Sequence, residues 1–165
     1  MKFQQRSGRT GKGLTLIEVI IALSLACIIS AAVILVISNI ISNQNRNLAR
    51  MAAVKQVENA LYWITEDTVQ AQMVNVNSTD YLIDLQWADL SGNSHEVQYT
   101  IDTTNKALTR CYDDGAITIV ASNIDINKTA TSFSNGKLTI DLTADAVGYP
   151  NASESREVNI YPRTM

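Results

Sequence analysis

Residues 11–30 read GKGLTLIEVIIALSLACIIS and place one carboxylate, Glu18, at the start of an otherwise uncharged apolar run. No residue from Val19 to Ile37 is charged, and the apolar stretch continues to Ile41. At about 1.5 Å per helical residue this stretch can cross a hydrocarbon core of about 30 Å. We therefore predict a transmembrane helix over residues 14–41. An ionised side chain inside hydrocarbon costs several kcal/mol, so the position of Glu18 requires a reason.

The charge of the chain is unevenly distributed. Residues 1–13 carry four basic side chains and no acid, whereas the 165-residue chain has a formal net charge of −3. The remaining body is therefore strongly acidic, at −7 (−3 minus +4). Such a body argues against a nucleic-acid-binding surface based on bulk electrostatics. The basic residues of the C-terminal half are scattered: Lys106, Arg110, Lys128, Lys137, Arg156 and Arg163.

Two ordinary interpretations of the N-terminus leave features unexplained. A secretory signal peptide also has a basic start and an apolar run, but its apolar run is usually shorter and ends at a small-residue cleavage site. A plain membrane anchor explains the length and the basic flank, yet it gives no reason for Glu18 or for the Gly13-Leu14 junction. A third interpretation follows from the local motif.

The string Gly13-Leu14-Thr15-Leu16-Ile17-Glu18-Val19, after a short basic leader, resembles the class III signal of type IV prepilins and pseudopilins. The resemblance covers about the first 30 residues. It implies removal of residues 1–13 by a prepilin peptidase that cuts between Gly13 and Leu14. It also implies N-methylation of Leu14 and retention of the membrane helix, so that the chain joins other pilin or pseudopilin subunits through an assembly platform. Many pilins carry a proline, and often a glycine, in the middle of the corresponding helix. This chain departs from that pattern, since neither residue occurs between Leu14 and Ser91.

This resemblance suggests a role for Glu18 in subunit assembly. Cleavage would leave a cationic amine on Leu14, and staggered helices can place the Glu18 carboxylate of one subunit beside the amine of its neighbour. Such a pair fixes register more than it stabilises, because desolvation offsets much of the attraction. The alternative is an incidental acid at the membrane interface, where headgroups or water can reach it.

Beyond Ile41 the pattern changes from all-round apolar to amphipathic, and we expect the helix to continue through residues 42–76. Its apolar residues recur at spacings of three and four: Met51, Val54, Val57, Leu61 and Ile64. Residues 77–165 form the predicted head, where six segments alternate apolar and polar residues as half-buried strands do. They begin near residues 81, 96, 107, 116, 137 and 157. Asn135-Gly136 favours a tight primed turn. The predicted fold class is α+β, with the long helix packed against one antiparallel sheet.

We find no catalytic constellation, cofactor site or metal site in the head sequence. His95 lies in the polar stretch SGNSH and is expected to be a solvated loop residue. Asp113 and Asp114 precede a glycine and read as a simple turn, with a calcium site as the alternative. The two cysteines, Cys27 and Cys111, form no disulfide framework, and we expect the second to be a buried strand residue. Trp63, Trp87 and the tyrosines are expected to pack between helix and sheet.

Three further segments look similar to the J-type minor pseudopilins and related minor pilins: ALYWITEDTVQAQ, LTRCYDDGAITIVASNID and REVNIYPR. The predicted function is thus that of a non-enzymatic minor subunit of a type IV pilus, type II secretion or competence filament. The head is expected outside the cytoplasmic (inner) membrane, which the chain spans once before it enters the filament. The alternative is a single-pass membrane module whose head binds a ligand.

Overall fold

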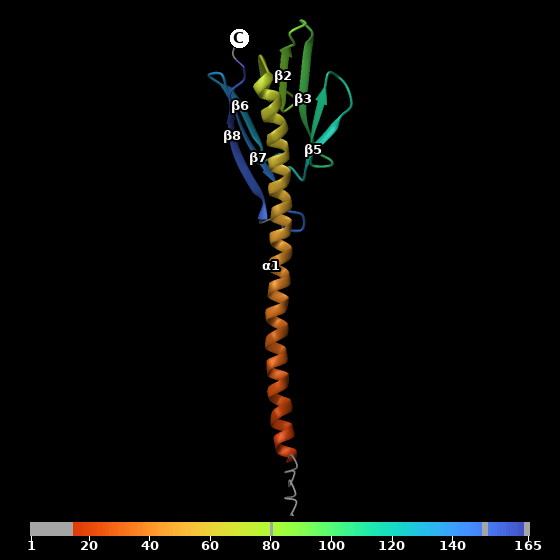
Figure 1. Cartoon of the computed structure of the whole chain (residues 1–165), viewed down its shortest axis with the longest axis vertical. Coiled ribbons are helices and arrows are strands. Elements are labelled where there is room, and N and C mark those ends of the chain that lie inside the picture. Colours follow the sequence, from red (N-terminus) through yellow and green to blue (C-terminus); the bar gives the residue numbers. More distant parts are fainter. Residues whose placement is uncertain (1–14, 80, 150–151, 164–165) are drawn as a thin grey trace, which may run out of the picture. The chain divides into compact units, whose positions relative to one another are not determined.

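The computed structural model describes residues 15–79, 81–149 and 152–163. It divides into two compact units, residues 1–43 and residues 44–165, and the second unit is the head. One helix, α1 (Leu16–Gln70), begins in the first unit and ends in the second. Eight strands follow among the described residues of the second unit: β1 (Met73–Val76), β2 (Ile83–Ala88), β3 (Ser94–Asp102), β4 (Ala107–Tyr112), β5 (Thr118–Ser122), β6 (Ala130–Ser134), β7 (Lys137–Ala144) and β8 (Glu154–Ile160). Figure 1 shows these elements. The predicted α+β class is confirmed.

The strands form two antiparallel sheets. The first has the order β1-β2-β3-β4-β5 and the second the order β6-β7-β8. An isolated bridge between Ile124 and Ala144 ties the end of β5 to β7. On the other side, the Asn77 amide after β1 donates to the Thr131 carbonyl of β6. The two sheets are thus connected at two places, between β5 and β7 and between β1 and β6.

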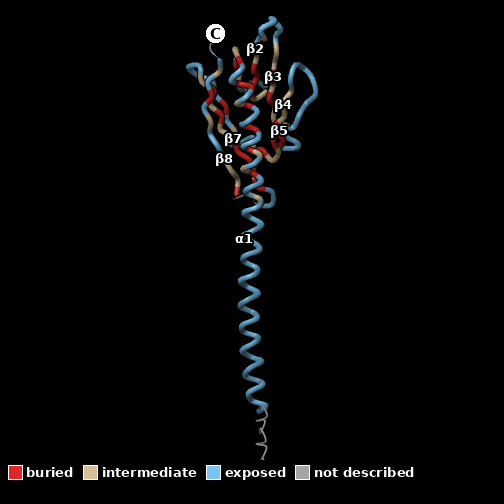
Figure 2. Tube along the Cα trace, in the orientation of Figure 1, coloured by how far each residue is buried: buried red, intermediate tan, exposed pale blue. Residues whose placement is uncertain are grey.

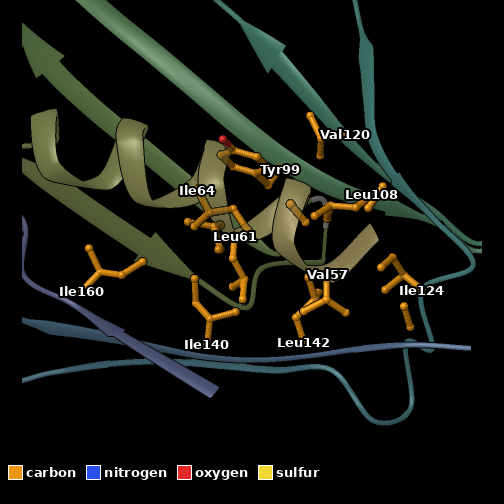
Figure 3. Close-up of a cluster of buried hydrophobic side chains, with 14 of the residues drawn as sticks. Val57, Leu61, Ile64, Tyr99, Leu108, Val120, Ile124, Ile140, Leu142 and Ile160 are labelled. Carbon is orange, nitrogen blue, oxygen red and sulfur yellow. The ribbon is translucent and has the colours of Figure 1, made fainter. Parts of the chain in front are cut away.

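The second half of α1 is amphipathic, and its apolar side packs against both sheets (Figure 3). Val57, Leu61 and Ile64 lie one or two turns apart on α1 and are buried. They meet the inward side chains of the first sheet, such as Tyr99 and Leu108, and those of the second, such as Ile140, Leu142 and Ile160. Strand alternation puts every second residue of β7 into this core. Fully burying one such side chain contributes about 1.5–3 kcal/mol.

Polar side chains of α1 hold it against the edge strands on either side. Its Asn59 side-chain amide donates to the Val120 backbone carbonyl, and the Ser122 N–H donates to the side-chain Oε1 of Gln56, so α1 satisfies part of the free edge of β5. On β8, Glu154 and Arg156 pair with Arg50 and Glu58 of α1 at 3.2 Å. The side chains of these two ion pairs are partly or largely accessible to solvent, so the pairs contribute little to stability and mainly orient α1 relative to β8.

The single predicted sheet is wrong, because the strands divide into two sheets with a break after β5. Asn123 adopts a left-handed φ of 59°, and the chain then turns through residues 125–129 into β6, which the sequence pattern had not indicated. The segment ATSFS of β6 is polar, and only Thr131 is buried in it. Without alternating apolar residues, its strand character comes from pairing with β7.

The predicted helix over residues 42–76 is too long, since α1 ends at Gln70 and residues 73–76 form β1. The backbone of the segment MVNV pairs in register with β2, and this pairing overrides the helical spacing of the apolar residues. The predicted buried stripe is correct at Val57, Leu61 and Ile64 but wrong at Met51, which is exposed. Ala53 and Ala60 are buried in its place, because small residues allow close approach to the sheets.

Candidate functional site

The first turn of α1 is closed by a reciprocal cap between Thr15 and Glu18. The Thr15 carbonyl accepts the first helical hydrogen bond, from the Val19 N–H, which makes Thr15 the N-cap residue. The Thr15 N–H donates to Glu18 Oε2 at 3.0 Å, and its hydroxyl donates to the same oxygen at 2.9 Å. The Glu18 N–H points back to Thr15 Oγ1 at 3.4 Å. This is a capping box, worth about 0.5–2 kcal/mol to the helix.

The cap gives Glu18 a local role that sequence analysis missed. An acid at the third helical position satisfies an N–H that would otherwise lack a partner and interacts favourably with the helix N-terminus. Both hydrogen bonds that the carboxylate accepts from Thr15 end on Oε2. Among the described residues, none donates a hydrogen bond to Oε1. The signal was present in the sequence, since Thr-x-x-Glu before an apolar run is the capping-box pattern.

From Leu16 to Leu48 every side chain of α1 is exposed, including the apolar ones (Figure 2). Sixteen large apolar side chains between Leu16 and Ile41 are at least half exposed. Burying them would contribute tens of kcal/mol at about 1.5–3 kcal/mol each, so water is not their stable environment. By length and composition this helix can cross a membrane. Lipid or the apolar surfaces of other helices must cover it.

The other predicted site residues at this end, Gly13 and Leu14, lie outside the described residues. Residues 9–34 match the family model for the prokaryotic N-terminal methylation motif. The chain carries the N-terminal segment of a type IV prepilin or pseudopilin. No curated protein matches it significantly.

This motif supports a type IV pilin-like subunit that prepilin peptidase processes, and it indicates a structural role. It implies assembly with other pilins. The motif and the exposed apolar helix together fit membrane anchoring of a separate head. The match to the motif stops at residue 34 and does not cover the head.

The prediction for His95 is wrong, because it is a half-buried residue of β3 and not a solvated loop residue. Its Nδ1 lies 2.7 Å from Asp113 Oδ2 and 2.9 Å from the Tyr112 hydroxyl, and its Nε2 lies 3.6 Å from Asp89 Oδ2. The hydrogen bond to Asp113 raises the pKa of His95, and Asp89 adds to the effect. His95 therefore ties the β2–β3 turn to the β4–β5 turn.

Asp113 and Asp114 form a turn, as predicted, and both adopt left-handed φ angles, 47° and 53°. The Gly115 N–H closes this turn on the Tyr112 carbonyl at 2.8 Å. The Glu96 N–H donates to Asp113 Oδ1 at 2.7 Å, which lowers the pKa of Asp113 together with the bond to His95. In the part of the chain that the structure describes, no three His, Cys, Asp or Glu side chains group to hold a metal ion.

A buried ionic network in the head also escaped the sequence analysis. Asp67 of α1 accepts two hydrogen bonds from Arg110 of β4, from Nε at 2.7 Å and from Nη2 at 2.9 Å. The Tyr99 hydroxyl of β3 donates to the same carboxylate. The guanidinium also lies over the rings of Trp63 and Tyr112, at 5.2 and 5.4 Å from the ring centroids. The network joins the helix to the sheet.

Burial governs the ionisation of this network. It is the main cause that raises the pKa of Tyr99, so the phenol stays protonated and donates to Asp67. The hydrogen bond to Asp67 raises the pKa of Arg110 and keeps the guanidinium charged. Arg110 is thus engaged inside the head rather than free on its surface. An acid such as Asp67 on the apolar side of a predicted helix was the available sequence signal.

The remaining residues that were predicted to pack in the core differ in how far they are buried. Cys111 lies on β4, as predicted, but is half-buried rather than buried, and Cys27 is exposed on α1. Tyr99 packs fully between helix and sheet, whereas Trp63 remains 38% exposed and Trp87 half-buried. The Arg110 guanidinium lies over the Trp63 ring.

Proposed function

We propose that this chain is a minor subunit, placed at the tip or acting in priming, of a type IV pilus, type II secretion or competence filament. The observation that carries the proposal is the methylation motif, which runs into a capped helix whose large apolar side chains between Leu16 and Ile41 are at least half exposed. A minor rather than a major subunit is supported by the cysteines. A major pilin usually closes its C-terminal region with a disulfide, and the head sequence holds only Cys111.

In this proposal the peptidase cuts between Gly13 and Leu14 and methylates Leu14. Residues 1–13 are lost, and residues 14–41 lie first in the cytoplasmic (inner) membrane and later in the filament core. The remaining residues form the extracytoplasmic head with its helical support. The chain needs the peptidase, the assembly platform and other pilin-like subunits as partners.

We further propose that Glu18 has two separate tasks. Its Oε2 closes the capping box with Thr15, which holds the carboxylate at the very start of the helix. Its second oxygen then accepts a hydrogen bond from the methylated amine of a neighbouring Leu14, which sets the stagger between subunits. Pairing the acid with a cation removes the cost of a lone charge among apolar side chains.

Mass spectrometry of the full-length protein purified from its own membrane tests the processing step. A polypeptide that begins at methylated Leu14 is expected, and Gly13→Lys is expected to block cleavage. An intact, unmethylated N-terminus in the wild-type protein would contradict the proposal. That result would favour a single-pass membrane module with a ligand-binding head.

Paired substitutions separate the two tasks of Glu18. Glu18→Gln keeps an oxygen that can accept the Thr15 N–H but removes the charge, so processing should be normal and assembly should fail. Thr15→Val removes the capping hydroxyl but keeps the carboxylate, so assembly should weaken much less. Cross-linking of neighbouring subunits in intact cells measures assembly. Equal assembly by wild type and Glu18→Gln would refute a role for the charge.

A further inference from the structure

A cleft of about 710 Å³ opens in the head between three elements that lie far apart in the sequence. Its walls are the last turn of α1, the end of β2 with its following turn, and the segment after β8. The lining residues used below are Val69, Trp87, Asp89, Leu90, Tyr161 and Arg163. Figure 1 shows the C-terminal end of α1 beside β2.

The walls of the cleft combine polar side chains with large apolar ones that face solvent. Leu90 is fully exposed, Tyr161 is 68% exposed and Val69 is 51% exposed. Trp87 is half-buried, and one side of it packs near the His95 ring at 5.8 Å between centroids. Aromatic and long aliphatic side chains gathered around an open cleft are the usual anchor points of a protein interface.

Arg163 gives this cleft a positive charge that no ion pair neutralises among the described residues. Three other arginines of the head, Arg50, Arg110 and Arg156, each pair with a carboxylate. Arg163 is exposed and has no ion-pair partner among the described residues. In a body with a net charge of −7, an unpaired guanidinium beside aromatic rings is a local site for an acidic group.

Asp89, the one acid of this lining, does not neutralise Arg163. Its Oδ1 accepts the N–H groups of Ser91 and Asn93, both at 2.8 Å. Its Oδ2 accepts the Asn93 amide at 2.9 Å and faces His95 Nε2 at 3.6 Å. Both oxygens are thus used inside the β2–β3 turn, which they hold in place as one wall of the cleft.

We propose that this cleft binds a peptide segment of a partner protein in which an aromatic or long aliphatic side chain neighbours a carboxylate. The apolar side chain packs between Trp87, Leu90 and Tyr161, and the carboxylate accepts hydrogen bonds from Arg163. Because this site lies wholly within the head, it goes beyond the proposed filament function and holds whether or not that function is correct.

The two tryptophans allow a direct test with the full-length protein in dodecyl maltoside. 5-Fluorotryptophan labelling gives two ¹⁹F signals, which Trp63→Phe and Trp87→Phe assign. Trp87 lines the cleft, and Trp63 does not. The probe is acetyl-Gly-Phe-Glu-Gly-amide, and its matched control carries Gln in place of Glu. The Glu probe should shift the Trp87 signal saturably and leave the Trp63 signal in place.

Substitutions then test whether Arg163 is the cation that binds the carboxylate of the Glu probe. Arg163→Gln should weaken binding of the Glu probe about fivefold, the upper range for an exposed ion pair, and should abolish the preference for Glu over Gln. Arg156→Gln, which removes an arginine already paired with Glu58, should change binding less than twofold. Leu90→Ala, at a fully exposed position that cannot disturb the core, should weaken both probes equally.

Three results would overturn the proposal. The first is a Trp87 signal that does not move with either probe. The second is a Trp63 signal that moves as far as that of Trp87. The third is an Arg163→Gln variant that still prefers the Glu probe. An unchanged Trp87 signal together with a correctly processed N-terminus would refute the cleft alone and leave the filament function standing.

Discussion

Replacing Asp67 with asparagine should destabilise the head far more than removing any surface charge. The Asp67 side chain is only 7% exposed and that of Arg110 is 18% exposed. Asparagine has the same shape but no charge, so it would leave the guanidinium without its counter-ion at the interface of α1 and β4. The Tyr99 hydroxyl would also lose a charged acceptor.

The expected loss of unfolding free energy in Asp67→Asn follows from the burial of this ion pair. Breaking a buried ion pair by removing one partner costs about 3–5 kcal/mol, because the remaining charge is uncompensated. Arg110 keeps some contact with solvent, so the lower end, about 3 kcal/mol, applies here. With a denaturant slope of about 2 kcal/mol per molar urea, the unfolding midpoint should fall by about 1.5 M.

Urea unfolding of the full-length chain in detergent measures this shift. Tryptophan fluorescence reports it, since both tryptophans lie in the head and Trp63 contacts the Arg110 guanidinium. Glu58→Gln is the matched control, because its pair with Arg156 has side chains 52% and 46% exposed. That change should cost less than about 1 kcal/mol.

A double-mutant cycle completes the test. Arg110→Gln combined with Asp67→Asn removes both charges, and the double variant should be more stable than the sum of the single losses predicts, by about 1–3 kcal/mol. The reasoning is refuted if Asp67→Asn behaves like Glu58→Gln, or if the two single losses simply add.

Three further predictions concern the head. Ala60→Leu should destabilise the head by about 1–3 kcal/mol in urea unfolding, because Ala60 is fully buried and the larger side chain overpacks the core; an unchanged midpoint would show spare room there. Gly136→Ala should lower the thermal midpoint by an amount equivalent to about 1 kcal/mol, because Gly136 has a φ of +70° in the β6–β7 turn. A Cβ at this position meets no neighbouring atom, so the loss comes from backbone conformation alone. An Ala variant as stable as wild type would contradict this prediction. His95→Gln should remove a pH-dependent part of the stability, because the pKa of His95 in the folded protein is raised above 6.5. The stabilisation by His95 is therefore complete below pH 6.5 and is lost as the pH rises through the folded pKa. Thermal melts of wild type and variant across this pH window should converge at the alkaline end, and a difference that does not change with pH would contradict the prediction.

Local chemistry determined the features of this protein that the sequence alone could predict. The uncharged run after Glu18 specifies an apolar helix whatever follows it, because hydrophobicity and helical rise act over neighbouring residues. The alternation in β7 and the Asn135-Gly136 pair specify a strand and its turn for the same reason, and both residues of that turn have the left-handed φ angles it requires. The Thr15–Glu18 cap belongs to this class as well, although its pattern was overlooked.

Tertiary structure alone decided which residues meet across long stretches of chain. Asp67 and Arg110 lie 43 positions apart, and His95 and Asp113 lie 18 apart, so only the strand order and register bring each pair together. The division into two sheets and the strand state of residues 73–76 depend on pairing with distant strands in the same way. Burial of Ala53 and Ala60 in place of Met51 follows from how closely α1 approaches the sheets, because packing distance is a property of the assembled core and not of the helix itself.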